Sequence, residues 1–284
     1  MTIPILYSFI EILIVILPTL LSVAFITIIE RKVIGAMQRR IGPNVVGYYG
    51  VLQPFADALK LVVKEQIIPS QAQKTLFILA PIITLVFSIL GWAVIPFGQG
   101  LTLNDYSLGV LYSLCLSRIG VYGILFAGWS ANSKFAFLGA LRSTAQIISY
   151  ELVYRSAVIC VILLCGRFNI TNIIESQNVW YALPLLPIFV MYFVSALAET
   201  NRTPFDFPEA ESELVAGFMT EHRGIIFVFF FLAEYCSIVL ISTFSAILFL
   251  GGYNMPEIFR NNTFINFQRF LLGMKALIFI FIFV

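Results

Sequence analysis

Charged side chains are scarce in this sequence. Only 11% of its 284 residues are Asp, Glu, Lys or Arg, whereas 60% are hydrophobic. A soluble domain needs charged and polar residues to cover its surface. The shortage of charge therefore excludes a soluble globular domain and indicates a polytopic membrane protein.

Metal-ligating side chains are also few. His222 is the single histidine, which excludes a haem held by two histidines. The four cysteines lie in apolar runs, and no two have the CxxC spacing of an iron–sulfur or zinc site. They are Cys115, Cys160, Cys165 and Cys236. We therefore expect small buried thiols, no metal site and no cofactor bound by this chain, so that any redox centres lie on other chains.

Strand-like alternation is absent, which argues against a barrel, whereas long apolar runs are present. A helix needs about 20 apolar residues to cross a hydrocarbon core of ~30 Å. The sequence predicts an all-α membrane helical bundle, a single domain over residues 1–284 with seven transmembrane segments, the last incomplete. The predicted segments are 5–29, 75–96, 109–129, 143–165, 180–198, 225–250 and 270–284.

Basic residues predict the orientation of this bundle. Loops 30–74, 130–142 and 199–224 lie on one side and contain eleven of the 17 Lys and Arg residues, while the opposite loops contain three. Basic loops stay on the cytoplasmic or matrix side. We therefore expect the N-terminus on the outer, positive side of the membrane.

A short amphipathic helix is predicted over residues 53–66. Asp57 and Lys60 share one face with Lys64, and Phe55 lies on an apolar face with leucine and valine residues. Fourteen residues make about 21 Å of helix, which is too short to cross the membrane. This helix is therefore expected to lie on the membrane surface.

The segment 199–223 is strongly acidic although it lies on the basic side of the membrane. Its carboxylates are Glu199, Asp206, Glu209, Glu211, Glu213 and Glu221, against only Arg202 and Arg223. Clustered carboxylates interact, and such a cluster binds protons more readily than isolated groups do. The charge pattern fits a proton site and a solvated acidic loop equally well.

Four charges lie within apolar segments. Glu151 and Arg155 are four residues apart, in the order that favours an ion pair on one helix face. Glu234 and Arg118 lie deep in their own segments. Such residues face the bundle interior or water and mark ion or proton paths, or they form static structural pairs. We expect a functional role for Glu234, whereas Arg155 fits a structural role at least as well.

The segment 30–47 is basic and contains Arg31, Arg39 and Arg40. One interpretation is an orientation signal that faces anionic lipid. Next to an amphipathic helix, the same residues could also form the rim of a portal that opens toward lipid.

Four stretches resemble one family, subunit 1 of respiratory complex I, known in bacteria as the H chain of NADH dehydrogenase. They are ERKVIGAMQRRIGPNVVGYYGVLQPFADALKLVVKE (30–65), GVYGILFAGWSANSKFAFLGALRSTAQIISYE (120–151), AETNRTPFDFPEAESELVAGFMTE (198–221) and FFFLAEY (229–235). These stretches are long and specific and run through most of the chain.

The resemblance implies a membrane subunit of a proton-translocating NADH:ubiquinone oxidoreductase that forms the membrane end of the quinone tunnel. It places Arg31, Arg39, Phe55, Asp57 and Lys60 at the quinone access site. It also implies a carboxylate proton path, made by Glu151, Glu199, Asp206, Glu209, Glu211, Glu213, Glu221 and Glu234.

The family context also implies partners and a location. NADH, FMN and the iron–sulfur clusters would be bound by peripheral-arm subunits, ubiquinone would be the substrate, and phospholipid would surround the chain. Nucleic acid is not expected as a partner. The location would be the mitochondrial inner membrane or the bacterial cytoplasmic membrane. Arg118 and Arg155 depart from the family pattern, and Arg202 completes the set of expected structural cations.

Two other functions fit the same features. An energy-converting hydrogenase uses a related membrane subunit without quinone, and bound quinone would distinguish it. A free-standing secondary transporter often shows internal repeats, which are not found here, and would be isolated as a monomer.

The last predicted segment, 270–284, has fifteen residues and makes about 22 Å of helix. The resembling family continues beyond this point with a further helix. We therefore expect a second, short polypeptide to complete the bundle near Val284, unless the sequence is cut there or another subunit shields its end.

Overall fold

The computed structural model describes residues 2–206, 216–255 and 268–283. In these ranges the protein is helical and no β-strand is present, as the sequence predicted. The α-helices are α1 (Thr2–Met37), α2 (Gln53–Val63), α3 (Lys74–Leu90), α4 (Gly109–Ser130), α5 (Lys134–Cys165), α6 (Ile170–Glu175), α7 (Leu186–Glu199), α9 (Ile225–Leu250) and α10 (Gln268–Phe283). Three short 3₁₀ turns are η1 (Tyr48–Gly50), η2 (Gly91–Val94) and η3 (Gly217–Met219).

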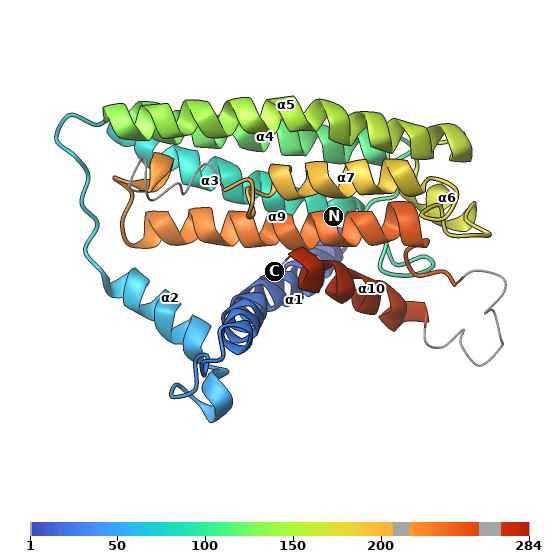
Figure 1. Ribbon diagram of the computed structural model, residues 1–284, viewed down its shortest axis with the longest axis horizontal. Coiled ribbons are helices and arrows are strands. Elements are labelled where there is room, and N and C mark those ends of the chain that lie inside the picture. Colours follow the sequence, from blue (N-terminus) through green and yellow to red (C-terminus); the bar gives the residue numbers. More distant parts are fainter. Residues whose placement is uncertain (1, 207–215, 256–267, 284) are drawn as a thin grey trace.

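The long helices form a layered bundle (Figure 1). Helices α4 and α5 lie together on one side, and α3, α7 and α9 run beneath them in nearly the same direction. Helix α10 packs against α9, and α1 leaves the bundle at a steep angle toward α2. The main core lies between α5, α7, α9 and the neighbouring loops, around Tyr192, Phe244 and Phe249.

Five helices are long and apolar enough to cross a membrane, judged by length and composition. They are Tyr7–Met37, Lys74–Val94, Gly109–Ser130, Lys134–Cys165 and Ile225–Leu250, and two shorter apolar helices are Leu186–Glu199 and Phe270–Phe283. The chain is therefore a multi-pass membrane protein. The predicted number of seven spans is not confirmed by this measure.

Several predicted boundaries were wrong because helices continue past the apolar runs. Helix α1 extends to Met37, since residues 30–37 contain no proline and Glu30 is held by contacts with other segments. Helix α5 begins at Lys134 rather than at residue 143, and residues 180–185 form turns ahead of Pro187, which lies in the first turn of α7. The amphipathic helix was predicted correctly: α2 has no buried residue, although it ends at Val63.

A close backbone contact fixes α5 against η3. A Cβ atom at Gly139 would lie only 2.7 Å from the carbonyl carbon and 2.8 Å from the Cα of Gly217. These are backbone atoms that cannot rotate away, so any side chain at residue 139 would push η3 outward. Residues Phe218 and Met219 of η3 line the largest cavity of the described bundle, so this contact also shapes the functional site.

We predict that Gly139→Ala lowers the stability of the assembled protein by about 1–3 kcal/mol, the usual effect of overpacking a filled space. Gly120→Ala is the matched control, because a Cβ on this α4 glycine meets nothing within 4 Å. Thermal denaturation of the two purified variants measures the difference. Equal midpoints for both would contradict the packing account.

Candidate functional site

A cavity of about 160 Å³ lies within the bundle. Its walls come from α3, α4, α9, η3 and the C-terminal end of α7, together with the loop that follows α7. The polar side chains that line it are Thr84, Ser88, Ser113, Ser117, Glu199, Thr200, Asn201, Asp206, Glu234 and Ser237. This volume is enough for several water molecules, which polar groups of this kind can hold.

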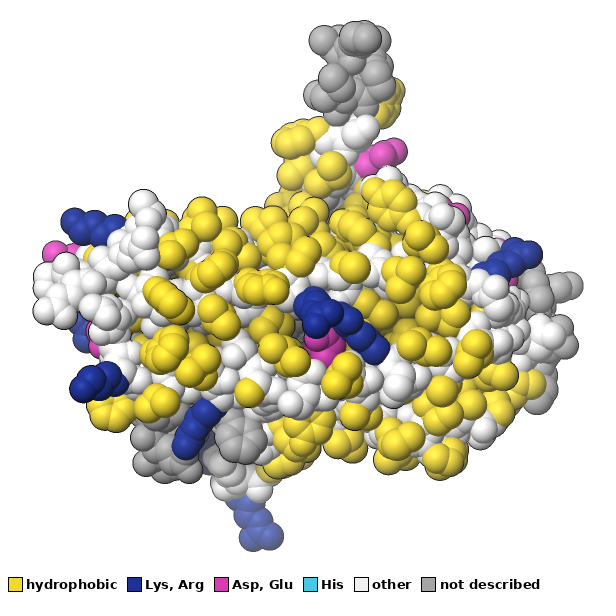
Figure 2. Space-filling view, turned by 90° about the horizontal axis from the view of Figure 1, so that it is seen from above, with side chains coloured by type: hydrophobic (Ala, Val, Ile, Leu, Met, Phe, Trp, Pro, Cys, Tyr) yellow, Lys and Arg dark blue, Asp and Glu magenta, His cyan; other side chains and the backbone are white. Residues whose placement is uncertain are grey.

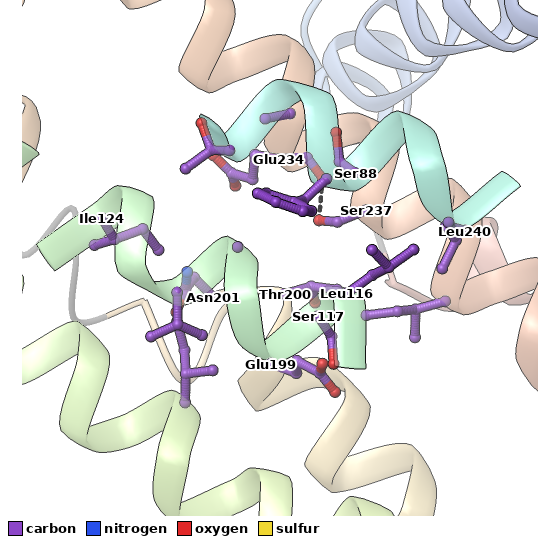
Figure 3. A pocket seen from close by; sticks show the side chains of 18 of the residues that line it. Ser88, Leu116, Ser117, Ile124, Glu199, Thr200, Asn201, Glu234, Ser237 and Leu240 are labelled. Carbon is purple, nitrogen blue, oxygen red and sulfur yellow. Dashed lines mark hydrogen bonds between the residues drawn. The ribbon is translucent and has the colours of Figure 1, made fainter. Parts of the chain in front are cut away.

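Three carboxylates from separate segments share this cavity. Glu199 is the last residue of α7, Asp206 follows in the loop, and Glu234 lies in α9. In Figure 3, Ser117 and Glu199 lie together at one end of the view, and Glu234 lies with Ser237 toward the other. The Oε2 atom of Glu199 is buried and has no hydrogen-bond partner within the described residues. A buried carboxylate oxygen of this kind is costly to leave unsatisfied, and water in the cavity can satisfy it.

A fourth carboxylate, Glu151 of α5, lies just behind the cavity wall. It is only 4% exposed and forms the predicted ion pair with Arg155, so that prediction is confirmed. The Arg155 Nη2 atom also donates a hydrogen bond to the Leu114 carbonyl oxygen at 3.0 Å. Glu199 interacts electrostatically with both Glu151 and Arg155. The four acidic groups are therefore one neighbourhood, with a guanidinium at its edge.

A second polar cluster joins α1, the loop after α7, and α9. Both guanidinium nitrogens Nη1 and Nη2 of Arg202 donate to the Glu30 carboxylate, the latter at 3.1 Å. The Tyr235 hydroxyl donates to Glu30 Oε2 at 2.6 Å, and its ring lies 4.9 Å from Arg202 Cζ. Burial alone would lower the pKa of Arg202, but the hydrogen bond to Glu30 and the neighbouring carboxylates raise it above its ordinary value, so the arginine stays charged.

Sequence reasoning placed Arg202 among the structural cations but did not identify Glu30 or Tyr235. The available signal was the position of Glu30, which ends the long apolar run of the first segment and precedes Arg31. A carboxylate at that point, opposite an arginine in a polar loop, is a candidate for a buried pair. The partners are 172 residues apart, however, and no helical spacing links them.

The predicted rim residues gather where α1 meets α2. Arg31 Nη1 donates to Asp57 Oδ2 at 2.7 Å, and Gln53 donates to the other oxygen of Asp57 at 2.8 Å. The Phe55 ring packs edge-on against Phe25 at 6.3 Å between centroids. These contacts hold the amphipathic helix against the end of α1.

The remaining predicted site residues lie elsewhere. Lys60 and Arg39 are exposed near the rim, and Arg39 has a positive φ of 56° in the turn that follows α1. Glu221 is half-buried after η3 and does not line the cavity. Arg118 is exposed on α4. Glu209, Glu211 and Glu213 lie outside the described residues.

The single histidine does not join these clusters. His222 stacks on Phe77 with 4.1 Å between ring centroids, and burial lowers its pKa to about 4. It is therefore neutral at physiological pH. In the part of the chain that the structure describes, no three His, Cys, Asp or Glu side chains are grouped so that they could hold a metal ion.

Comparisons with known proteins identify the family. The model of the NADH dehydrogenase family matches residues 10–284. NADH-ubiquinone oxidoreductase chain 1 of Mycosarcoma maydis is 74% identical over 283 residues, which are 99% of this chain and 86% of that protein. The same chain of Yarrowia lipolytica is 53% identical over 247 residues, 87% of this chain and 72% of that one.

A bacterial relative shows the same relationship. The corresponding membrane chain of the NADH-quinone oxidoreductase of Rhodospirillum centenum is 53% identical over 247 residues, which cover 87% of this chain and 74% of that protein. Mitochondrial and bacterial relatives thus agree with the resemblance seen in the sequence motifs. The chain belongs to the NADH dehydrogenase family, as a membrane subunit of the complex I subunit 1 type.

Proposed function

We propose that the cavity between α3, α4, α7 and α9 begins a proton path that is coupled to quinone reduction. The observation that carries this proposal is the convergence of Glu199, Asp206 and Glu234 on one polar cavity, with Glu151 immediately behind its wall. Carboxylates in a membrane protein are costly unless they face a polar interior, and there they act as proton relays. The acidic side chains of Glu209, Glu211, Glu213 and Glu221 extend this path toward the membrane surface.

Quinone access belongs to the rim at α1 and α2. Arg31, Arg39 and Lys60 supply positive charge, Phe55 supplies an apolar surface, and Asp57 fixes Arg31 in place. A surface helix with one apolar face suits a portal through which a lipid-soluble quinone leaves the membrane. Ubiquinone is the substrate, and NADH, FMN and the iron–sulfur clusters are held by partner subunits of the peripheral arm.

The chain's own residues bind and move protons; they do not transfer electrons. The hydroxyls of Ser117 and Ser237 and the cavity water connect the carboxylates, and apolar side chains such as Phe230 and Phe244 separate the cavity from lipid. The Arg155 guanidinium holds Glu151 in its charged form, so Glu199 and Glu234 are the better candidates for groups that change protonation.

The membrane arrangement follows from the family. The chain is one membrane domain, and α7 and α10 cross the membrane with the five longer helices to give seven segments. The N-terminus lies on the outer, positive side, and the surrounding phospholipid is that of the mitochondrial inner membrane.

Neutralising the cavity carboxylates tests this proposal. We expect Glu199→Gln and Glu234→Gln to lower quinone-dependent NADH oxidation and proton translocation by at least about tenfold, because a relay group contributes of that order or more. Reduction of a soluble electron acceptor by NADH should be unchanged, since that reaction does not need the membrane arm. The matched control is Glu175→Gln on α6, whose side chain is exposed and outside the cavity. Full quinone-coupled pumping in both cavity variants would refute the path.

A further inference from the structure

Arg118 occupies a position where a charge is expensive. It is the tenth of the 22 residues of α4, so it lies about 14 Å along a helix of about 33 Å, near the middle of the hydrocarbon core. Its side chain is exposed. Leu111 and Tyr122, which are seven residues before it and four after it, are 41% and 54% exposed on the same apolar face of the helix.

The cavity cannot shelter this guanidinium, because it lies on another face of α4. Ser113 and Ser117 point into the cavity, and Arg118 does not line it. No hydrogen bond or ion pair joins Arg118 to any other residue within 2–206, 216–255 and 268–283.

A second guanidinium lies at the same depth. Arg155 of α5 reaches across to the carbonyl oxygen of Leu114, which is one helical turn before Arg118. Glu151 pairs with Arg155 and neutralises one of the two cations. The α4–α5 face therefore has one unbalanced positive charge at mid-membrane depth. Figure 2 shows basic side chains and an acidic one together in the middle of the otherwise hydrophobic face above these helices.

We propose that the α4–α5 face around Arg118 seats a membrane helix of another subunit, and that this helix carries an Asp or Glu opposite Arg118. Charge complementarity selects a carboxylate, since it removes the net charge that Glu151 leaves unbalanced. The planar guanidinium also binds a carboxylate through two parallel hydrogen bonds. The proposal requires that the chain works inside a larger membrane complex, but it does not depend on the proton path.

The competing occupant is lipid, and the two cases predict opposite effects of removing the charge. If a partner carboxylate pairs with Arg118, Arg118→Met leaves that carboxylate buried and unpaired. The amount of assembled complex in solubilised membranes, measured on native gels, should then fall by roughly tenfold. Arg118→Lys keeps the charge and should retain most of the assembly. If Arg118 faces lipid, Arg118→Met removes a penalty, and assembly is unchanged or improved, which would overturn the proposal.

Leu152→Met is the matched control, because Leu152 is 71% exposed on α5 and the change replaces one apolar side chain with another. It should leave assembly intact. A second measurement does not depend on any variant: the structure of the wild-type complex in lipid nanodiscs. A carboxylate oxygen of another subunit within hydrogen-bond distance of the Arg118 guanidinium would support the proposal. A lipid phosphate or only water at that position would overturn it.

Discussion

Replacing Arg202 with Gln is expected to destabilise the protein by about 3–5 kcal/mol, because removing one partner of a buried ion pair leaves the other charge uncompensated. Arg202 and Glu30 retain only 17% and 13% of their side-chain exposure, and their bidentate contact links the loop after α7 to α1. The same loop carries Asp206 into the cavity, so quinone-dependent activity should fall together with stability. Thermal denaturation of the purified complex and NADH:quinone activity measure the two effects.

Two further variants show whether burial is the cause. Arg31→Gln breaks an ion pair with Asp57 in which the two side chains are 55% and 37% exposed, and we expect a loss of at most about 1 kcal/mol. Tyr235→Phe removes only the hydroxyl that donates to Glu30 and should cost about 1 kcal/mol. If Arg202→Gln were no more harmful than Arg31→Gln, the Glu30 cluster would not be a structural link.

Replacing Lys275 with Met is expected to detach α10 from α9, with a loss of roughly 2–4 kcal/mol, since a charged donor contributes about 1.5–3 kcal/mol per hydrogen bond and such contributions are not additive. The Lys275 side chain is buried and donates to the carbonyl oxygens of Leu250, Gly252 and Asn254 at 2.7, 2.7 and 2.8 Å. These carbonyls follow or end α9, where a cation also complements the helix dipole. Hydrogen exchange in α10, together with the denaturation midpoint, reports the loss.

Lys74→Met is the comparison for the Lys275 variant. Lys74 is exposed at the start of α3, and its replacement should change stability by no more than about 0.5 kcal/mol. Unchanged protection of α10 in the Lys275 variant would mean that apolar contacts alone, such as those of Phe279 and Phe283 with Phe193, hold this helix.

Features with a local spacing were predictable from the sequence. The Glu151–Arg155 pair follows from an i, i+4 arrangement within one helix, and α2 follows from its amphipathic pattern and from Pro54 in its first turn. The depth of Glu234 in an apolar run was enough to indicate a polar interior around it, because a carboxylate cannot face lipid cheaply.

Features that depend on packing between distant segments were not predictable. The pairing of Glu30 with Arg202, the capping of α9 by Lys275 and the contact between Gly139 and Gly217 join residues far apart in the chain. Helix ends were also misjudged, since apolar runs mark the part of a helix inside lipid, while α1 and α5 continue into the polar region. The outward direction of Arg118 depends on how α4 is rotated against its neighbours, which hydropathy does not reveal.

The central claim is that the cavity carboxylates change protonation when quinone is reduced. Infrared difference spectroscopy of the intact complex, recorded between its oxidised and quinol-reduced states, tests it most directly. The account predicts a carboxyl band in the wild-type difference spectrum that is lost or diminished in Glu199→Gln or Glu234→Gln and kept in Glu175→Gln. Difference spectra that are identical in the carboxyl region for the wild type and both cavity variants would contradict it.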